Sequence, residues 1–242
     1  MPKSRFAVAV LVGLVCIAGQ AVADEPPPPW QNTASLGYLS TSGNTDTQSF
    51  ALEYSLKHTP DPWGLEVLAR MLRAESDGDR TAERYEAGMR ASRALNQRWS
   101  VYAGAAALKD EFAGLDLRWG LVAGAAFHLL QGPTHDLALN AGLAWTSEDP
   151  TVGSSFDYLG AELGAAYAWN FSKTASLTEA LRFSPSFDDT DDWRLVSETA
   201  LKATLTSVLA VKLGYEWRYD NEPIAGFDST DTATTVSLVA KF

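Results

Sequence analysis

Residues 209–219 of this 242-residue chain read LAVKLGYEWRY and alternate between two kinds of side chain. The odd positions carry apolar or aromatic side chains: Leu209, Val211, Leu213, Tyr215, Trp217 and Tyr219. The even positions carry small or charged side chains: Ala210, Lys212, Gly214, Glu216 and Arg218. Because successive side chains of a β-strand point to opposite faces, this pattern predicts a strand with one apolar and one polar face.

The same alternation recurs along most of the chain, and it delimits twelve runs of 10–14 residues. These runs are 33–42, 47–57, 63–74, 81–93, 98–109, 116–129, 136–147, 156–169, 174–184, 193–205, 208–220 and 231–242. They are about twice as long as the average strand of a soluble protein. A tilted strand needs about this length to cross a bilayer.

A soluble antiparallel sandwich would also alternate, but the two faces of these runs favour a membrane protein. The apolar faces carry aromatic residues near their ends, as an interfacial belt does: Trp63, Trp99, Trp145, Trp169, Trp193 and Trp217. The other faces carry charge and glycine instead of a second core. Strands cross hydrocarbon only as a closed barrel, because an open edge leaves backbone groups unpaired. The sequence therefore predicts an all-β fold, a transmembrane antiparallel up-and-down β-barrel of about 12 strands over residues 33–242.

The first residues have the pattern of an export signal. Lys3 and Arg5 precede an apolar run over residues 6–18, and small residues at 21–23 fit a cleavage site after Ala23. We expect residues 1–23 to be a cleaved signal peptide and residues 24–32, with four consecutive prolines, to be a short periplasmic spacer.

The composition of the remaining 219 residues excludes several classes of function. They hold 17 basic and 30 acidic residues, a net charge of −13, and they lack cysteine because Cys16 lies in the signal. Disulfide scaffolds, cysteine nucleophiles and thiolate metal sites are excluded. So acidic a chain is also a poor nucleic-acid binder. We expect no cofactor and no bound catalytic metal.

The connections between the runs predict how the barrel is oriented. Starting from the periplasm, alternate connections become outer loops, and these are longer and more acidic than the inner turns. Their acidic residues are Asp77, Asp79, Glu148, Asp149, Asp188, Asp189, Asp191, Asp192 and Asp228. The chain ends in an alternating run on Phe242, the type of terminus that outer-membrane assembly machinery recognises. These features predict insertion in the outer membrane of a Gram-negative bacterium, with lipid and lipopolysaccharide as neighbours.

Three short segments of the chain resemble a known family, the salt-induced outer-membrane proteins, which is described as a domain of unknown function. They are Leu36-Gly37-Tyr38 with Ser42-Gly43-Asn44-Thr45, Lys109-Asp110-Glu111-Phe112 with Leu115-Asp116-Leu117-Arg118, and Asn221-Glu222-Pro223 with Asp231-Thr232 and Lys241-Phe242. Their order and spacing carry the resemblance over roughly residues 33–242. The resemblance implies an outer-membrane barrel without assigned catalytic residues, and its name suggests a response to salt.

Enzyme motifs are missing from the sequence. The histidines His58, His128 and His135 fall in or near expected inner turns, at the wrong end for chemistry on outer-leaflet lipid. Neither a Gly-x-Ser-x-Gly elbow nor a His-x-Ser-Asn-Gly stretch like that of outer-membrane phospholipases occurs. An outer-membrane hydrolase is therefore only a remote alternative, and we expect no catalytic residue.

The polar faces of the runs place charged residues in the barrel lumen. Eleven basic residues are expected there: Lys57, Arg70, Arg84, Arg90, Arg118, Arg182, Arg194, Lys202, Lys212, Arg218 and Lys241. Seven acidic residues accompany them: Glu53, Glu66, Glu86, Asp116, Glu162, Glu198 and Glu216. Two interpretations stay open, a lumen plugged by ion pairs and a narrow, weakly anion-preferring channel. Glu179 breaks the pattern, because the simple alternation points it toward lipid unless a bulge intervenes.

The outer loops also have two interpretations. Asp188, Asp189, Asp191 and Asp192 supply oxygens of the kind that a divalent cation prefers, but they lack the glycine and glutamate of an EF-hand loop and fit a solvated loop equally. Such carboxylates would also bridge to lipopolysaccharide through divalent ions. We therefore expect a non-enzymatic envelope barrel, either a narrow solute channel linked to salt or osmotic conditions or a plugged barrel whose loops bind cations, lipopolysaccharide or a partner.

Overall fold

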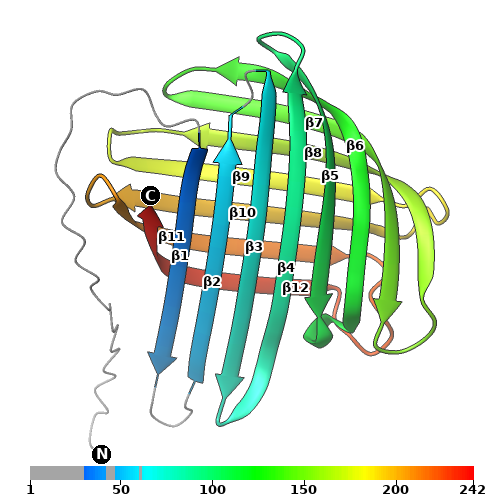
Figure 1. Ribbon diagram of the computed structural model, residues 1–242. Coiled ribbons are helices and arrows are strands. Elements are labelled where there is room, and N and C mark those ends of the chain that lie inside the picture. The colour runs from blue at the N-terminus through cyan, green and yellow to red at the C-terminus, as the bar shows by residue number, and fades with distance from the viewer. Residues whose placement is uncertain (1–29, 42–46, 60–61) are drawn as a thin grey trace, which may run out of the picture.

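The computed structural model describes residues 30–41, 47–59 and 62–242, and in that part of the chain it forms one closed antiparallel β-barrel (Figure 1). The twelve strands are β1 (Trp30–Thr41), β2 (Thr47–His58), β3 (Trp63–Ser76), β4 (Asp79–Ala94), β5 (Trp99–Asp110), β6 (Leu115–Gln131), β7 (His135–Pro150), β8 (Phe156–Trp169), β9 (Ala175–Pro185), β10 (Trp193–Thr204), β11 (Leu209–Asp220) and β12 (Thr230–Lys241). A single 3₁₀ turn, η1 (Glu111–Ala113), follows β5. No helix among the described residues has the length and apolarity needed to span a membrane.

Each strand falls on one of the twelve alternating runs, so the expected all-β barrel is confirmed. The expected signal peptide and the segment Ser42-Gly43-Asn44-Thr45 lie outside the described residues. β1 begins at Trp30, three residues earlier than expected, because Trp30 pairs with His58 and their rings lie 4.5 Å apart. β7 continues to Pro150 and thereby takes in Glu148, which the sequence placed in an outer loop.

The barrel closes where the first strand pairs with the last. β1 and β12 are antiparallel from Thr33↔Lys241 to Gly37↔Ser237. The terminal residue extends this seam, since the backbone amide of Phe242 donates to the carbonyl of Asn32 at 3.1 Å and the reverse bond measures 3.3 Å. Every strand therefore has a hydrogen-bonded neighbour on both sides, as a strand in hydrocarbon requires.

The distribution of side chains is inverted relative to a soluble protein. Large apolar side chains on the outside remain exposed, among them Leu143, Trp63, Met89 and Leu121 at 68%, 61%, 55% and 52%. The buried residues include polar ones such as Glu148, Ser35 and Ser237. An apolar outer band around a polar interior is the arrangement of a transmembrane barrel.

Aromatic side chains cluster at the rims of this outer band. Trp193 contacts Phe183 and Tyr219 with ring centroids 5.7 and 5.1 Å apart near the loop end of β9–β11. Trp99 contacts Phe127 at 4.8 Å near the opposite end of β5 and β6. These positions fit the interfacial belt that the sequence predicts.

Two paired glycines accommodate the most enclosed aromatic side chain of the lumen. Tyr102, 5% exposed, points inward from β5 over Gly124 on β6 and Gly142 on β7, which are register partners. A Cβ on Gly124 would lie 2.8 Å from the Tyr102 hydroxyl and 2.3 Å from the Ala141 carbonyl oxygen. The glycines are therefore required by close packing.

We expect Gly124→Ala to lower the free energy of unfolding by about 2 kcal/mol, because overpacking a filled site forces backbone and side chain apart. Urea-induced unfolding of the folded barrel in detergent or lipid measures this. Gly88→Ala on β4 is the matched control, since a Cβ there would meet nothing closer than 3.6 Å. Equal stability of the two variants would contradict the packing argument.

Candidate functional site

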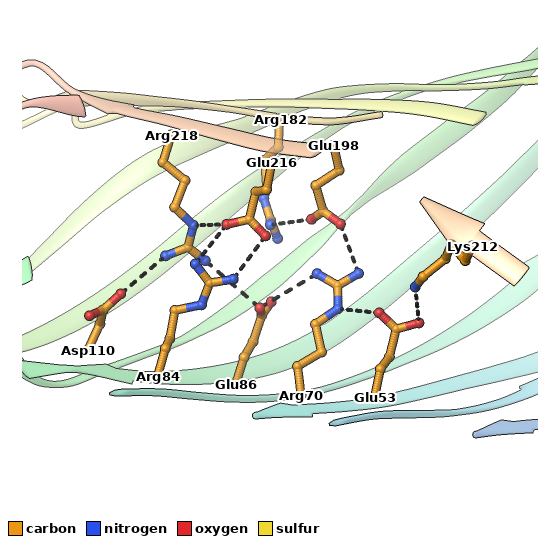
Figure 2. A network of polar contacts seen from close by, with 10 residues as sticks. All are labelled: Glu53, Arg70, Arg84, Glu86, Asp110, Arg182, Glu198, Lys212, Glu216 and Arg218. Carbon is orange, nitrogen blue, oxygen red and sulfur yellow. Dashed lines mark hydrogen bonds and ion pairs between the residues drawn. The ribbon is translucent and has the colours of Figure 1, made fainter. Parts of the chain in front are cut away.

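An ion-pair lattice crosses the lumen and joins its opposite walls (Figure 2). We use this name for ten side chains: Glu53, Arg70, Arg84, Glu86, Asp110, Arg182, Glu198, Lys212, Glu216 and Arg218. Its firmest contact across the barrel is bidentate. Arg84 on β4 donates from Nη1 and Nη2 to the two carboxylate oxygens of Glu216 on β11, at 2.8 and 2.9 Å. Such a fork fixes geometry as well as charge.

Arg70 occupies the centre of a second set of contacts. Its guanidinium lies 2.8 Å from Glu198 on the far wall, 3.1 Å from Glu53 on the neighbouring strand and 3.7 Å from Glu86. Lys212, from β11, donates to the other oxygen of Glu53 at 2.7 Å. One arginine thus links β2, β3, β4 and β10, as Figure 2 shows.

The lattice continues toward the outer loops through Arg218. Its Nε donates to Glu216 at 2.5 Å, and its two terminal nitrogens lie 3.9 Å from Glu86 and from Asp110. Arg182 contributes a longer contact of 3.9 Å to Glu198. The side chains of the lattice range from 11% to 41% exposed, so the lattice is partly hydrated.

A second cluster surrounds Glu148 near the outer end of the lumen. Glu148 is 2% exposed and accepts from Arg118 at 2.8 Å and from the Tyr158 hydroxyl at 2.8 Å, while Arg194 lies 3.0 Å away. Arg194 also donates to Asp220 at 2.9 Å. A carboxylate so enclosed is stable only while its cationic partners remain.

A separate pair lies against Tyr102 on the other side of the lumen. Arg90 on β4 reaches Glu162 on β8 at 3.1 Å, and its guanidinium carbon lies 3.8 Å from the centre of the Tyr102 ring. The cation–π contact and the ion pair hold the arginine against the wall.

Two cavities adjoin the lattice. The first cavity has a volume of about 240 Å³, adjoins β5–β8 and is lined by residues that include Glu86, Arg218 and Arg118. The second cavity has a volume of about 110 Å³, adjoins β1–β3 and β12 and is lined by residues that include Arg84 and Glu216. Residues of the lattice therefore form a wall of each cavity.

The structure brings together thirteen of the eighteen charges that the sequence places in the lumen, each in at least one ion pair: Arg70, Arg84, Arg90, Arg118, Arg182, Arg194, Lys212, Arg218, Glu53, Glu86, Glu162, Glu198 and Glu216. Sequence reasoning missed four acidic partners: Asp110, Glu148, Asp192 and Asp220. Glu216, Arg218 and Asp220 are alternate residues of β11 and so share the inward face. The alternation in the sequence could therefore have identified Asp220 as a lumen residue.

These additional carboxylates change the charge balance of the lumen. The sequence suggested four more basic than acidic side chains, and the four missed acids offset that excess. Asp116 was also misplaced, since it lies 3.5 Å from Lys109 instead. The strand register shifts between Leu115 and Leu117, which alters the simple alternation there. The described lumen is therefore close to neutral.

The acidic segment before β10 folds back on the barrel. Asp188 accepts from the backbone amide of Leu159 at 3.4 Å, and Asp189 accepts from that of Asp191 at 2.9 Å. Asp192 is 8% exposed and lies 2.9 Å from Arg194, and burial raises the pKa of its carboxyl above the ordinary value. Within the described residues no group of three or more acidic, histidine or cysteine side chains is arranged to hold a metal ion.

The histidines lie at strand ends, in contact with aromatic or backbone groups. His58 Nδ1 lies 3.2 Å from the Trp63 carbonyl oxygen, and His135 Nδ1 lies 2.8 Å from the Tyr167 hydroxyl. His128 Nδ1 is buried without a hydrogen-bond partner among the described residues. None of these contacts pairs a histidine with a serine or threonine hydroxyl, the arrangement in which a histidine activates a hydroxyl nucleophile.

Sequence comparison relates the chain to proteins without an assigned role. Residues 34–242 match a family described as "Protein of unknown function, DUF481". The uncharacterized protein YdiY of Escherichia coli (strain K12) is 26% identical over 211 residues, which cover 87% of this chain and 82% of that protein. The salt-induced description suggested by the sequence resemblance is not part of either match.

Comparison of structures supports the fold. The NanC porin has a TM-score of 0.52 at 11% identity, with 87% of this chain and 97% of that chain covered. An outer membrane channel from Pseudomonas putida F1 has a TM-score of 0.52 at 14% identity, with 90% and 100% covered. At such low identity these likenesses show that the fold is that of an outer-membrane barrel.

We expect Glu148→Gln to lower the free energy of unfolding by about 3 kcal/mol, because removing one partner of a buried ion pair leaves the other charge uncompensated. Here Arg118 would lose its shortest ion pair, and Arg194 would retain only Asp192 and Asp220 among the described residues. Denaturant titration of the folded barrel measures the loss. Glu66→Gln is the control, since Glu66 and Lys57 are about half exposed and such a pair contributes less than about 1 kcal/mol. A loss at Glu148 no larger than that at Glu66 would refute the assignment.

Proposed function

Because the chain belongs to the DUF481 family of proteins of unknown function, we propose its role from its own lumen: a non-enzymatic outer-membrane channel for small hydrophilic solutes, constricted by the ion-pair lattice. The observation that carries the proposal is the position of the lattice between two cavities. Glu86 and Arg218 line the first cavity, and Arg84 and Glu216 line the second. A solute would pass from one cavity to the other through these four side chains.

The size of the barrel supports a narrow bore. Twelve strands give an interior between that of eight-stranded barrels, which side chains fill, and that of sixteen-stranded porins, which hold an aqueous channel. The lattice reduces this interior further. Long, partly hydrated arginine and glutamate side chains can move apart without any change in the backbone, so the constriction limits passage without sealing it.

Weak anion preference arises in this proposal from the periplasmic half of the lumen. The constriction itself is close to charge-balanced, so it contributes little selectivity. Lys202 and Lys241 have no ion-pair partner among the described residues, and Lys202 is the register partner of Lys212. Uncompensated ammonium groups attract anions into a pore.

A link to salt follows from the exposure of the lattice. Attraction between partly hydrated charges weakens as ionic strength rises, because the Debye length falls from about 10 Å at 0.1 M to about 3 Å at 1 M. The contacts of 3.7–3.9 Å made by Arg70, Arg182 and Arg218 are the ones most easily separated. The constriction therefore widens in concentrated salt.

The alternative is a plugged barrel that acts through its acidic outer loops. The bidentate Arg84–Glu216 contact favours it, because two short hydrogen bonds resist separation. In this proposal the loop carboxylates bind cations that bridge to lipopolysaccharide, or they bind a partner protein. A correctly folded barrel that carries no current in a planar bilayer, with or without its lattice, would favour this alternative.

For the channel we expect the ratio of single-channel conductance to bulk conductivity to rise between 0.1 and 2 M salt, because screening loosens the lattice. The double variant Arg84→Ala/Glu216→Ala removes one charge of each sign and should raise conductance severalfold at low salt, with a flatter salt dependence. Planar-bilayer recordings of the refolded protein measure both effects.

The control for this comparison is Lys57→Ala/Glu66→Ala. It removes a similar pair, 2.8 Å apart but about half exposed, and should leave the conductance near that of the wild type. If the two double variants changed the conductance equally, the conductance would not depend on the lattice. That result would refute the role of the lattice as the constriction.

Reversal potential tests the origin of selectivity. In a salt gradient the wild type should show a small shift toward anions, and Lys202→Glu/Lys241→Glu should move the reversal potential toward cations, because charged side chains lining a pore set its preference. Lys173→Glu, in the exposed turn between β8 and β9, changes charge outside the lumen and serves as the control. An unchanged reversal potential in the lysine double variant would locate selectivity elsewhere.

A further inference from the structure

A row of polar side chains crosses the lipid-facing surface of β8 to β12. The continuous register of these strands makes Tyr167, Glu179, Thr199, Tyr215 and Thr234 successive partners. They share the outward face with the apolar side chains of the same strands, which include Leu163, Leu181, Leu201, Leu213 and Val236. No bulge occurs in β9, so the outward direction of Glu179 is a consequence of strict alternation.

Glu179 lies within the apolar band. It is the fifth of the 11 residues of β9, and its outward neighbours on that strand are Leu177 and Leu181. Phe183, four residues along, belongs to the aromatic cluster at the outer rim. With a rise of about 3.4 Å per residue and a tilt of about 45°, Glu179 lies roughly 10 Å deeper in the membrane than that cluster.

The carboxylate of Glu179 is held by two hydroxyl groups of β10. Ser197 Oγ donates to Oε1 at 2.6 Å, and Thr199 Oγ1 donates to Oε2 at 2.5 Å. Each carboxylate oxygen can accept a further hydrogen bond. A built polar site therefore lies at a depth where lipid offers only hydrocarbon.

The surroundings of Glu179 differ from those of the other outward charges on the described strands. Its outward neighbours on β9 are leucines, whereas Arg73 and Glu83 are register partners and pair with Glu75 and Arg80. Further outward charges lie next to the terminal residues of their strands: Arg93, Lys109, Asp149 and Asp157. Ionisable groups inside the hydrocarbon are costly and generally face protein. Besides Ser197 and Thr199, the groups able to bond Glu179 at this depth would come from another membrane-spanning surface, because the lipid there is hydrocarbon.

The same face also carries hydroxyl donors that are free. Tyr215 is 47% exposed, and its hydroxyl makes no hydrogen bond to any other described residue. Two strands separate it from Glu179, which corresponds to about 10 Å along the row. The face thus contains both a hydrogen-bond acceptor, the Glu179 carboxylate, and a donor without a partner among the described residues, the Tyr215 hydroxyl. Two copies of this face would therefore be complementary to each other.

We propose that the outward face of β9–β11, centred on Glu179, Ser197 and Thr199, is the contact surface between two copies of this chain in the membrane. A contact about a two-fold axis places the same patch on both sides, so each copy offers its hydroxyl donors to the carboxylate of the other. The leucines around the row pack against their counterparts and exclude lipid.

Cysteine cross-linking in native outer membranes tests this surface. A Cys16→Ser background removes the sole cysteine of the chain. Leu201→Cys, outward on β10 and 42% exposed, reports on the proposed contact. Met89→Cys, outward and 55% exposed on β4, is the matched control on the opposite wall, since β4 lies six strands from β10 around the barrel (Figure 1).

After oxidation we expect Leu201→Cys to give at least about fivefold more cross-linked dimer than Met89→Cys, because an isologous contact brings a residue near its own copy. Equal yields at the two positions would overturn the proposal. A cross-link from Leu201→Cys to a different protein would also overturn it, because the occupant would then be another partner.

A second measurement does not depend on oxidation. Sedimentation of the detergent-solubilised wild type should show a dimer, and Glu179→Leu should weaken self-association by about tenfold, as the loss of an interchain hydrogen bond would. Glu179→Gln retains an acceptor and should stay dimeric. A wild type that is monomeric, or a Glu179→Leu variant that gains unfolding stability without a change in association, would show that the carboxylate has no protein partner.

Discussion

The requirement that every backbone amide and carbonyl be paired inside hydrocarbon governs this molecule. The seam between β1 and β12 satisfies that requirement for the last two strand edges, and the Asn32–Phe242 hydrogen bonds extend it to the end of the chain. Closure then determines where side chains can go. With a period of two, one series of residues must face lipid and the other must face the lumen, so the polar residues become the interior.

The ion-pair lattice is a direct product of closure. Arg84 and Glu216 are separated by 132 residues in the sequence, and Glu53 and Lys212 by 159. Neither pair would meet in an open sheet. The wall of the barrel also limits access of water to these charges, which strengthens their attraction and penalises an unpaired member. The near neutrality of the lumen is consistent with this penalty.

Glu179 shows the consequence of the same alternation when a lipid-facing position carries a charged residue in place of an apolar one. Because β9 pairs with both neighbours without a register shift, the carboxylate cannot turn inward. Ser197 and Thr199 on the adjacent strand then take over part of the role that water would have. Polar contacts on the two sides of the barrel wall thus differ in their surroundings: those inside join opposite walls of the lumen, and those outside lie among apolar side chains.

From the sequence alone, the period-two pattern determined the number of strands, their approximate limits and which side of the wall most of the charged side chains take, because side-chain direction in a strand is a local property. It did not determine the partners of those charges. Glu148 was assigned to a loop because β7 is longer than its apolar alternation, and Asp116 was assigned to the lumen because a register shift is invisible in sequence. Only the closed tertiary structure decided which side chains meet across the lumen, since contact between distant strands depends on the curvature and stagger of the whole barrel.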